Sequence, residues 1–162
     1  MATDSQSIAL SARLSLPSGP RVLALRGGLD PEINARKKWG NEVFESGYLI
    51  FPTVILRCQR FLDLESMDVL ILMNIAMHWW NYDDLPYPRP SAIGRRIGVS
   101  TRTVERRIAI MQKRGLIVRL PSENHNGKTV RRYDLSGLVK KLRKYARVYL
   151  DEWRGSREVP RV

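Results

Sequence analysis

The sequence predicts a mainly α-helical domain of the α+β class, in which short helices are followed by a small β-hairpin. Residues 65–80 are apolar almost all round a helix, which is typical of a central helix that other elements surround. Two shorter helical patterns follow, and only Gly-Val-Ser (residues 98–100) separates them. After Gly115 the apolar residues alternate instead, with Asn126-Gly127 between the alternating runs, and this combination indicates a hairpin.

The N-terminal part of the chain divides into two predicted segments. In residues 1–29, apolar and polar residues alternate before a Pro-Ser-Gly-Pro turn, so we expect either a hairpin or a flexible arm. Residues 30–62 form a predicted helical segment that packs on the core. One helix is expected over residues 30–39, where an Asp-Pro pair supplies a good start, and another over residues 53–62.

Residues 63–135 contain the central helix and two helices that are joined by a tight turn. The first helix of the pair ends at Ile97, and Gly98 suits the left-handed backbone that reverses the chain. Ser100 is a suitable N-cap for the second helix. Two helices joined in this way have the helix-turn-helix layout, in which the second helix lies in a DNA major groove.

The second helix, predicted over residues 101–114, has a basic outer face. Its apolar positions form one stripe that should face the core: Val104, Ile108 and Met111. Arg102, Thr103 and Arg106 then point outward, with Arg107 at the boundary. Arginine can bind guanine O6 and N7 with two hydrogen bonds, and threonine can contact a phosphate or a thymine methyl. The predicted DNA contacts here are Ser100, Thr101, Arg102, Thr103, Arg106 and Arg107.

Residues 116–135 form a predicted wing, with strands on either side of Asn126-Gly127. A basic hairpin after a recognition helix is positioned to touch phosphates or the minor groove. The predicted DNA contacts of the wing are Asn126, Lys128, Arg131 and Arg132. Phosphate contacts from the first helix of the pair are expected at Arg89, Arg95 and Arg96.

Residues 136–154 form a predicted amphipathic C-terminal helix, and residues 155–162 form a tail. The apolar seam of this helix consists of Leu138, Leu142, Tyr145 and Tyr149. Two arrangements remain open. The seam can pack back on its own domain, or it can form a two-helix homodimer contact that sets two DNA half-sites about 34 Å apart.

The positive charge of the chain is concentrated in one region. The formal net charge is +12, yet residues 1–88 contain eight Lys/Arg and ten Asp/Glu. Residues 89–147 contain seventeen Lys/Arg and three Asp/Glu. A contiguous basic region on an otherwise slightly acidic chain is the electrostatic pattern of a nucleic-acid-binding protein, and the expected partner is double-stranded DNA.

The sequence offers few groups for other kinds of chemistry. Cys58 is the only cysteine, and His78 and His125 are the only histidines, so we expect no zinc or redox site, no cofactor and no enzymatic activity. A secretory signal is not visible, and the longest apolar run is too short to span a bilayer. The expected location is therefore the cytoplasm, without membrane contact.

A set of short blocks runs through residues 39–140: Gly47-Tyr48 before Phe51-Pro52, Trp79-Trp80, Tyr87-Pro88, Ile97-Gly98-Val99-Ser100, Arg102-Thr103-Val104-Glu105-Arg106, Gly115-Leu116-Ile117 and Tyr133-Asp134-Leu135-Ser136-Gly137-Leu138. By these blocks the chain resembles the winged-helix type of helix-turn-helix protein that is common on bacterial plasmids, phages and integrative elements. The resemblance covers about two thirds of the chain. It implies a winged-helix fold and DNA binding in transcription regulation or replicon maintenance.

The chain departs from that pattern at two positions of the first helix. Arg89 stands where a capping serine is usual, and Gly94 stands where alanine is usual. We therefore expect this helix to be weaker or to lie closer to a neighbouring backbone. The first 30 residues have no counterpart in the resemblance.

Two functions follow from these observations. The first is a sequence-preferring double-stranded DNA-binding protein, acting as a transcription regulator or as a replicon-associated factor of a mobile element. The alternative is a subunit of a larger nucleoprotein complex that uses the winged helix for docking on protein, DNA or RNA. In that alternative, residues 1–29 would supply a strand to the sheet of a protein partner.

Overall fold

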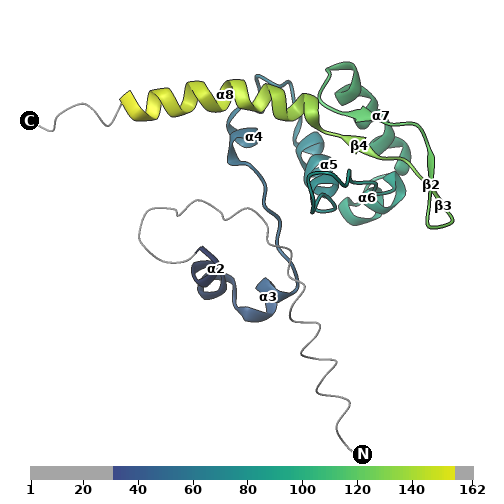
Figure 1. Ribbon diagram of the computed structural model, residues 1–162, viewed down its shortest axis with the longest axis horizontal. Helices are drawn as coiled ribbons and strands as arrows, with labels where there is room; N and C mark the ends of the chain where they lie inside the picture. The colour runs from purple at the N-terminus through teal and green to yellow at the C-terminus, as the bar shows by residue number, and fades with distance from the viewer. Residues whose placement is uncertain (1–30, 156–162) are drawn as a thin grey trace, which may run out of the picture. The chain divides into compact units, whose positions relative to one another are not determined.

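The computed structural model describes residues 31–155, which fall into two units divided between Tyr48 and Leu49 (Figure 1). The predicted hairpin or arm of residues 1–29 lies outside the described residues, as does the end of the tail. Residues 49–62 group with the winged-helix region and not with the preceding helices.

The described part of the first unit contains two short helices, α2 (Pro31–Trp39) and α3 (Asn41–Glu45). Gly40 joins them with a φ of 86°, which glycine adopts without steric cost. Phe44 is buried beneath the guanidinium of Arg36, which lies 4.3 Å from the ring centroid, and Tyr48 stacks on the same ring at 4.7 Å. One aromatic cluster thus organises this unit, and the helix predicted over residues 30–39 is present as α2.

The core of the second unit begins with α4 (Thr53–Arg57) and the turns that follow it. This segment contributes Ile55, Cys58, Leu62 and Leu64, all of which are buried. The helix ends at Arg57, earlier than the predicted residue 62, and Phe61 is 73% exposed. The segment therefore anchors the chain in the core while leaving one large aromatic ring in solvent.

The central helix is α5 (Ser66–Ala76). Its buried side chains include Ile71, Leu72 and Ile75, which are at most 1% exposed. The helix is shorter than the predicted span of residues 65–80, and it is not covered all round, because Leu70 is 44% exposed. Beyond its end, Trp80 is 67% exposed and does not close a buried helix as expected.

The helix-turn-helix pair is formed by α6 (Pro90–Ile97) and α7 (Thr101–Lys113). Gly98 has a φ of 74° and provides the predicted left-handed turn. A Cβ atom on Gly94 would lie 2.6 Å from the carbonyl oxygen of Val99, so only glycine lets the helix approach the turn this closely. The expected inward stripe of α7 is confirmed, since its three apolar side chains, Val104, Ile108 and Met111, are fully buried.

The wing consists of two short antiparallel ladders. At its base β1 (Val118–Arg119) pairs with β4 (Tyr133–Asp134), and at its tip β2 (Glu123–His125) pairs with β3 (Lys128–Val130). Asn126 and Gly127, with φ of 50° and 73°, form the predicted turn of the hairpin. The mainly helical α+β class with a small wing is thereby confirmed.

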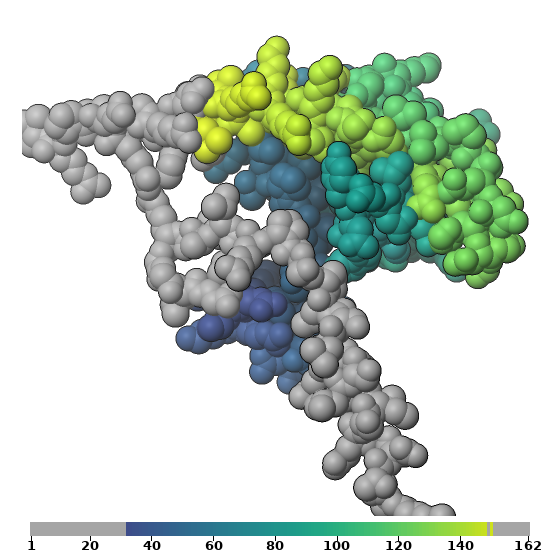
Figure 2. All heavy atoms as spheres, viewed as in Figure 1, coloured from purple at the N-terminus to yellow at the C-terminus, as the bar shows by residue number. Residues whose placement is uncertain are grey.

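The last helix, α8 (Ser136–Gly155), is fixed to the end of α7 by a backbone contact. A Cβ atom on Gly137 would lie 2.3 Å from the carbonyl oxygen of Gly115, so the two backbones meet where only glycine fits. Leu138 N also donates to Leu116 O at 2.9 Å. Figure 2 shows α8, in yellow, lying along the segment that contains α4.

The seam of α8 packs on its own domain. Leu138 and Leu142 are buried in the core, and Tyr145 packs against that core. These side chains are therefore not available for the two-helix dimer contact that the sequence left open. The side chain of Tyr149 lies outside the described part of the structure.

Candidate nucleic-acid interface

The outer face of α7 presents two arginine side chains without a partner. Arg102 and Arg106 lie one helical turn apart, and both are exposed. Neither makes a hydrogen bond or ion pair from its side chain within the described part of the chain. Ala109 continues the exposed face with a small side chain, so the first two turns of the helix can approach another molecule closely.

The start of α7 is capped as predicted. Ser100 Oγ accepts a hydrogen bond from Thr103 N at 3.1 Å, and the two hydroxyl oxygens lie 2.9 Å apart. The hydroxyl of Thr103 therefore serves the cap, and only Ser100 and Thr101 of the capping turn are exposed together with Arg102. Backbone N–H groups in the first turn of a helix have no carbonyl partner within it, which makes this end suited to a phosphate.

Arg107 does not belong to the outer face, which corrects the prediction for this residue. Its side chain is 9% exposed, and its Nε and Nη2 donate to the two oxygens of Asp68 at 2.7 and 2.5 Å. Nη1 donates to Glu65 Oε1 at 2.8 Å. These hydrogen bonds, chiefly those to Asp68, raise the pKa of Arg107 against the opposing effect of burial. The guanidinium therefore joins α7 to the start of α5 and cannot reach DNA.

The wing tip carries two exposed cations. Lys128, directly after the turn, has no partner within the described residues. Arg131 donates from Nε and Nη2 to Ser122 Oγ at 3.2 and 3.1 Å. A hydroxyl group does not neutralise a guanidinium, so Arg131 keeps its positive charge while its position is fixed. Asn126 is exposed at the turn itself.

Arg132, predicted as a fourth wing contact, is held within the protein instead. Its Nη1 donates to Asp84 Oδ1 at 2.6 Å, and its Nε donates to Glu123. The guanidinium also lies 5.1 Å from the ring centroid of Tyr87, and the side chain is 17% exposed. Hydrogen bonds to Glu123 and Asp84 raise its pKa. This arginine ties the wing to the loop before α6, which corrects its predicted role.

The three arginines of α6 point in different directions. Arg89, the N-cap residue, makes no capping hydrogen bond from its side chain, and it is exposed like Arg95. Arg96 instead donates from Nη1 to Asn74 Oδ1 at 2.8 Å and lies 3.2 Å from the sulfur of Met77. Arg89 and Arg95 are therefore free to meet a phosphate, and Arg96 is exposed and keeps its positive charge while the neutral amide of Asn74 fixes its position.

A basic groove of about 450 Å³ lies between the wing and the start of α6. Its charged lining residues are all cationic: Arg89, Arg119, Lys128 and Arg131. Arg119 is not among the contacts predicted from the sequence. A cation between the apolar residues Val118 and Leu120 of the predicted strand was the signal that could have indicated it.

Arg119 has a polar atom that the described part of the chain does not satisfy. Its Nε is buried and has no hydrogen-bond partner there, while its Nη2 lies 3.8 Å from Glu105 Oε1. The guanidinium also lies 5.9 Å from the ring centroid of Tyr133. The buried Nε cannot itself meet a ligand, but the guanidinium of Arg119 adds one more positive charge to the lining of the groove.

The interface brings together unneutralised cations from three elements: the first two turns of α7, the start of α6 and the wing. Phosphate binding requires charge and N–H donors, and base recognition requires side chains that project beyond the backbone; the interface has both. Within residues 31–155, no group of three His, Cys, Asp or Glu is placed to hold a metal ion. No helix in that range is long and apolar enough to cross a membrane.

A helix-turn-helix followed by a wing defines a winged-helix-like domain. No protein-family model matches the chain, and no curated protein matches it. Among solved structures, the chain is similar to the crystal structure of the N-terminal domain of DnaD protein from Geobacillus kaustophilus HTA426. The TM-score is 0.51 at 18% identity, over 73% of this chain and 96% of that chain. At this identity the likeness concerns the fold.

Proposed function

We propose that this chain binds double-stranded DNA, with the start of α7 in the major groove and the wing against the neighbouring backbone or minor groove. The observation that carries the proposal is the exposure of Arg102 and Arg106 without partners, beside the unpaired Lys128 of the wing. Unpaired cations on a helix and an adjacent hairpin match the regularly spaced negative phosphates on both sides of a duplex groove.

In this proposal, the two exposed arginines of α7, Arg102 and Arg106, make the specific base contacts. Arg106 lies one turn into the helix, where its planar guanidinium can donate two hydrogen bonds to guanine. The capped N-terminus of α7 donates to a phosphate, which fixes the depth of insertion. The proposed binding is therefore sequence-preferring and not only electrostatic.

The basic groove is proposed to hold a backbone phosphate beside the recognition helix. The cations Arg89, Arg119 and Lys128 line the groove and would attract a phosphate oxygen there. Binding of this kind without catalysis fits a transcription regulator or a replicon-associated factor, as the sequence resemblance implies.

Selection of bound sequences from a random duplex pool at physiological salt tests the proposal. We expect an enriched motif, and we expect Arg106→Ala to lose about 1–3 kcal/mol of discrimination at one base pair. Lys113→Ala removes an exposed charge at the other end of α7 and serves as the matched control, with the motif unchanged. Equal losses of affinity for selected and random duplexes in Arg106→Ala would exclude a base-reading role.

A second candidate is a subunit of a nucleoprotein assembly, which the exposed apolar side chains of the first unit favour. Trp39 is 61% exposed, and Val43 and Tyr48 are each 54% exposed. Apolar side chains gathered in so small a unit suit a protein contact. Light scattering on the full chain and on Trp39→Ser tests this: an assembly that dissociates with the substitution supports it, and identical masses contradict it.

A further inference from the structure

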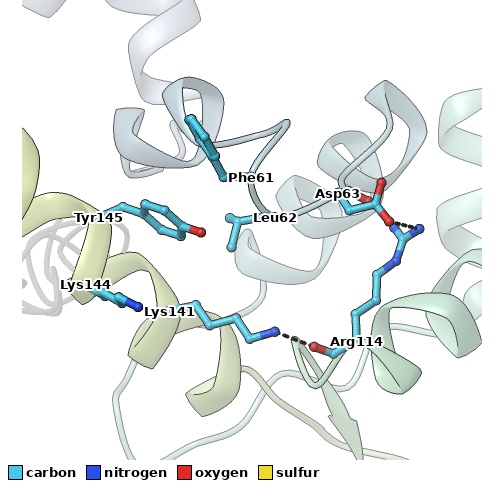
Figure 3. A pocket seen from close by; sticks show the side chains of 7 residues that line it. All are labelled: Phe61, Leu62, Asp63, Arg114, Lys141, Lys144 and Tyr145. Carbon is cyan, nitrogen blue, oxygen red and sulfur yellow. Dashed lines mark hydrogen bonds and ion pairs between the residues drawn. The ribbon is translucent and has the colours of Figure 1, made fainter.

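A second basic site lies at the opposite end of α7 from the duplex-facing arginines. It is a pocket of about 420 Å³ between the turn after α4, the end of α7 and the side of α8 (Figure 3). Arg102 and Arg114 are twelve residues apart, which is roughly 18 Å along a helix. A duplex on the outer face of the first turns of α7 would therefore leave this pocket free.

The pocket contains an exposed pair of aromatic rings. Phe61 and Tyr145 stack with their centroids 5.7 Å apart and an interplanar angle of 27°. Phe61 is 73% exposed, so it adds little to the core, and a large part of its ring remains available to another planar group. The half-buried Tyr145 holds that ring in place from α8.

The pocket is positively charged after its internal pairs are taken into account. Its one carboxylate, Asp63, lies 2.5 Å from Arg114 Nη2 and is neutralised by it. Lys141 Nζ donates to the carbonyl oxygen of Arg114 at 2.5 Å, which positions the ammonium without neutralising it. Lys144 makes no ion pair within the described residues, and Figure 3 shows both lysines on the α8 side of the pocket.

The charge continues beyond the pocket along α8. From Ser136 to Leu150 the helix contains five cations and no carboxylate, and each cation is exposed: Lys140, Lys141, Arg143, Lys144 and Arg147. At 100° per residue, Lys141 and Lys144 lie roughly 40° and 100° round the helix from Tyr145, whereas Arg143 and Arg147 lie roughly 160° away from it. Two pocket-lining lysines beside one aromatic platform, with further cations continuing round the helix, fit a polyanion with planar groups better than a peptide that brings one local acidic group.

We propose that this pocket and the adjacent face of α8 bind single-stranded DNA, with a base stacked on Phe61 and the following phosphates along the lysines. Aromatic stacking combined with a cationic track is the chemistry by which proteins bind single strands without reading their sequence. A base inside a duplex is stacked on its neighbours and cannot make this contact. The site therefore distinguishes a strand from a duplex, and it goes beyond the duplex binding proposed above.

The test is fluorescence anisotropy of a labelled oligothymidylate of about 12 nucleotides, titrated with the full chain. The titration uses the Arg102→Ala, Arg106→Ala chain, so that strand binding on the outer face of α7 does not contribute. In that background, we expect Phe61→Ala to weaken binding by roughly 5- to 100-fold, because one base loses its stacking partner. Lys144→Gln should lower the log–log salt slope by about 0.7.

Tyr82→Ala is the matched control, since this loop aromatic is 84% exposed and lies outside the pocket. It should leave oligonucleotide binding unchanged, and Phe61→Ala in the otherwise unaltered chain should leave duplex binding unchanged. The proposal is overturned if Phe61→Ala and Tyr82→Ala bind the oligonucleotide equally well. It is also overturned if an acidic peptide, and not the oligonucleotide, depends on Phe61. Neither result would affect duplex binding through α7, which the pool selection measures separately.

Discussion

Arg106 and Arg107 are neighbours in the sequence, yet one faces solvent and the other lies in the core. Arg106 is exposed and unpaired, whereas Arg107 holds Asp68 and Glu65 from a side chain that is 9% exposed. One residue advances the helix by about 100°, which carries a side chain from the outer face to the edge of the buried stripe. The direction of each arginine, and not the number of arginines, therefore defines the interface of α7.

The same contrast separates the other predicted contacts. Arg89, Arg95, Lys128 and Arg131 keep their charge at the surface, as does Arg96 beside the amide of Asn74, whereas Arg132 is paired with carboxylates. Arginines paired with carboxylates join elements to one another, and exposed arginines without a carboxylate partner are free for a ligand.

The largest expected effect is on folding stability, at Arg107. Arg107→Ala removes both short charge-assisted hydrogen bonds to Asp68, which is 0% exposed, and leaves it only the N–H of Glu65 and the more distant Arg114 Nη1 at 4.0 Å, so the free energy of unfolding should fall by about 3–5 kcal/mol. Urea denaturation measures this, with Arg106→Ala as the control that should change stability by less than about 0.5 kcal/mol. Replacing both partners, as Arg107→Met with Asp68→Leu, should recover much of the loss. Similar losses for Arg106→Ala and Arg107→Ala would contradict the contrast.

A smaller loss of stability is expected at Gly94, where the approach of α6 to the turn is closest. Gly94→Ala places a methyl group 2.6 Å from the carbonyl oxygen of Val99, so stability should fall by about 1–3 kcal/mol despite the better helix propensity of alanine. Ser91→Ala, at an exposed position of the same helix, is the control. Unchanged urea midpoints for both variants would show that the turn accommodates the methyl group.

The wing offers a comparison in DNA binding. Lys128→Ala should weaken binding to all duplexes alike and reduce the log–log salt slope by about 0.9, because one phosphate contact is lost. Arg132→Ala should leave that slope nearly unchanged, since Arg132 is occupied by Asp84 and Glu123. Anisotropy titrations over a range of salt concentrations measure both slopes. A larger change of slope for Arg132→Ala would place that arginine on the DNA.

The smallest effect concerns Arg96 and its influence on His78. Burial and, to a lesser extent, the charge of Arg96 lower the pKa of His78. The unfolded chain then binds the His78 proton more tightly, so this residue makes the protein less stable as the pH falls through the ordinary histidine range. Arg96→Gln should raise the pKa of His78 toward its ordinary value, as followed by NMR titration of the imidazole. An unchanged pKa of His78 in this variant would show that burial alone lowers it.

Much of the fold followed from local signals in the sequence. Gly98, Ser100 and Asn126-Gly127 determine their turns through backbone preferences that depend on few neighbours, and the structure has these turns where they were expected. The ends of α4 and α5 were placed too far along the chain, since the apolar residues Phe61 and Trp80 do not enter the core. Whether an apolar side chain is buried depends on which elements pack against it. The periodicity of the sequence does not contain that information.

The candidate site was predictable to the extent that it depends on helix phase. Arg102 and Arg106 followed from the buried stripe of α7. Arg107 and Arg132 could not be assigned in the same way, because their partners Asp68 and Asp84 are 39 and 48 residues away in the sequence. Arg119 could not be predicted as a candidate, because its place in the site depends on the groove that the wing and the start of α6 form together.

The glycine contact at the start of α8 has a mechanical consequence. With Gly137 seated on the carbonyl oxygen of Gly115, the long C-terminal helix is joined to the end of α7 without an intervening hinge. Twenty residues give α8 a length of about 30 Å, so a rotation of ~10° at the joint would displace its far end by ~5 Å. A force on the outer end of α8 would therefore act as a torque on α7.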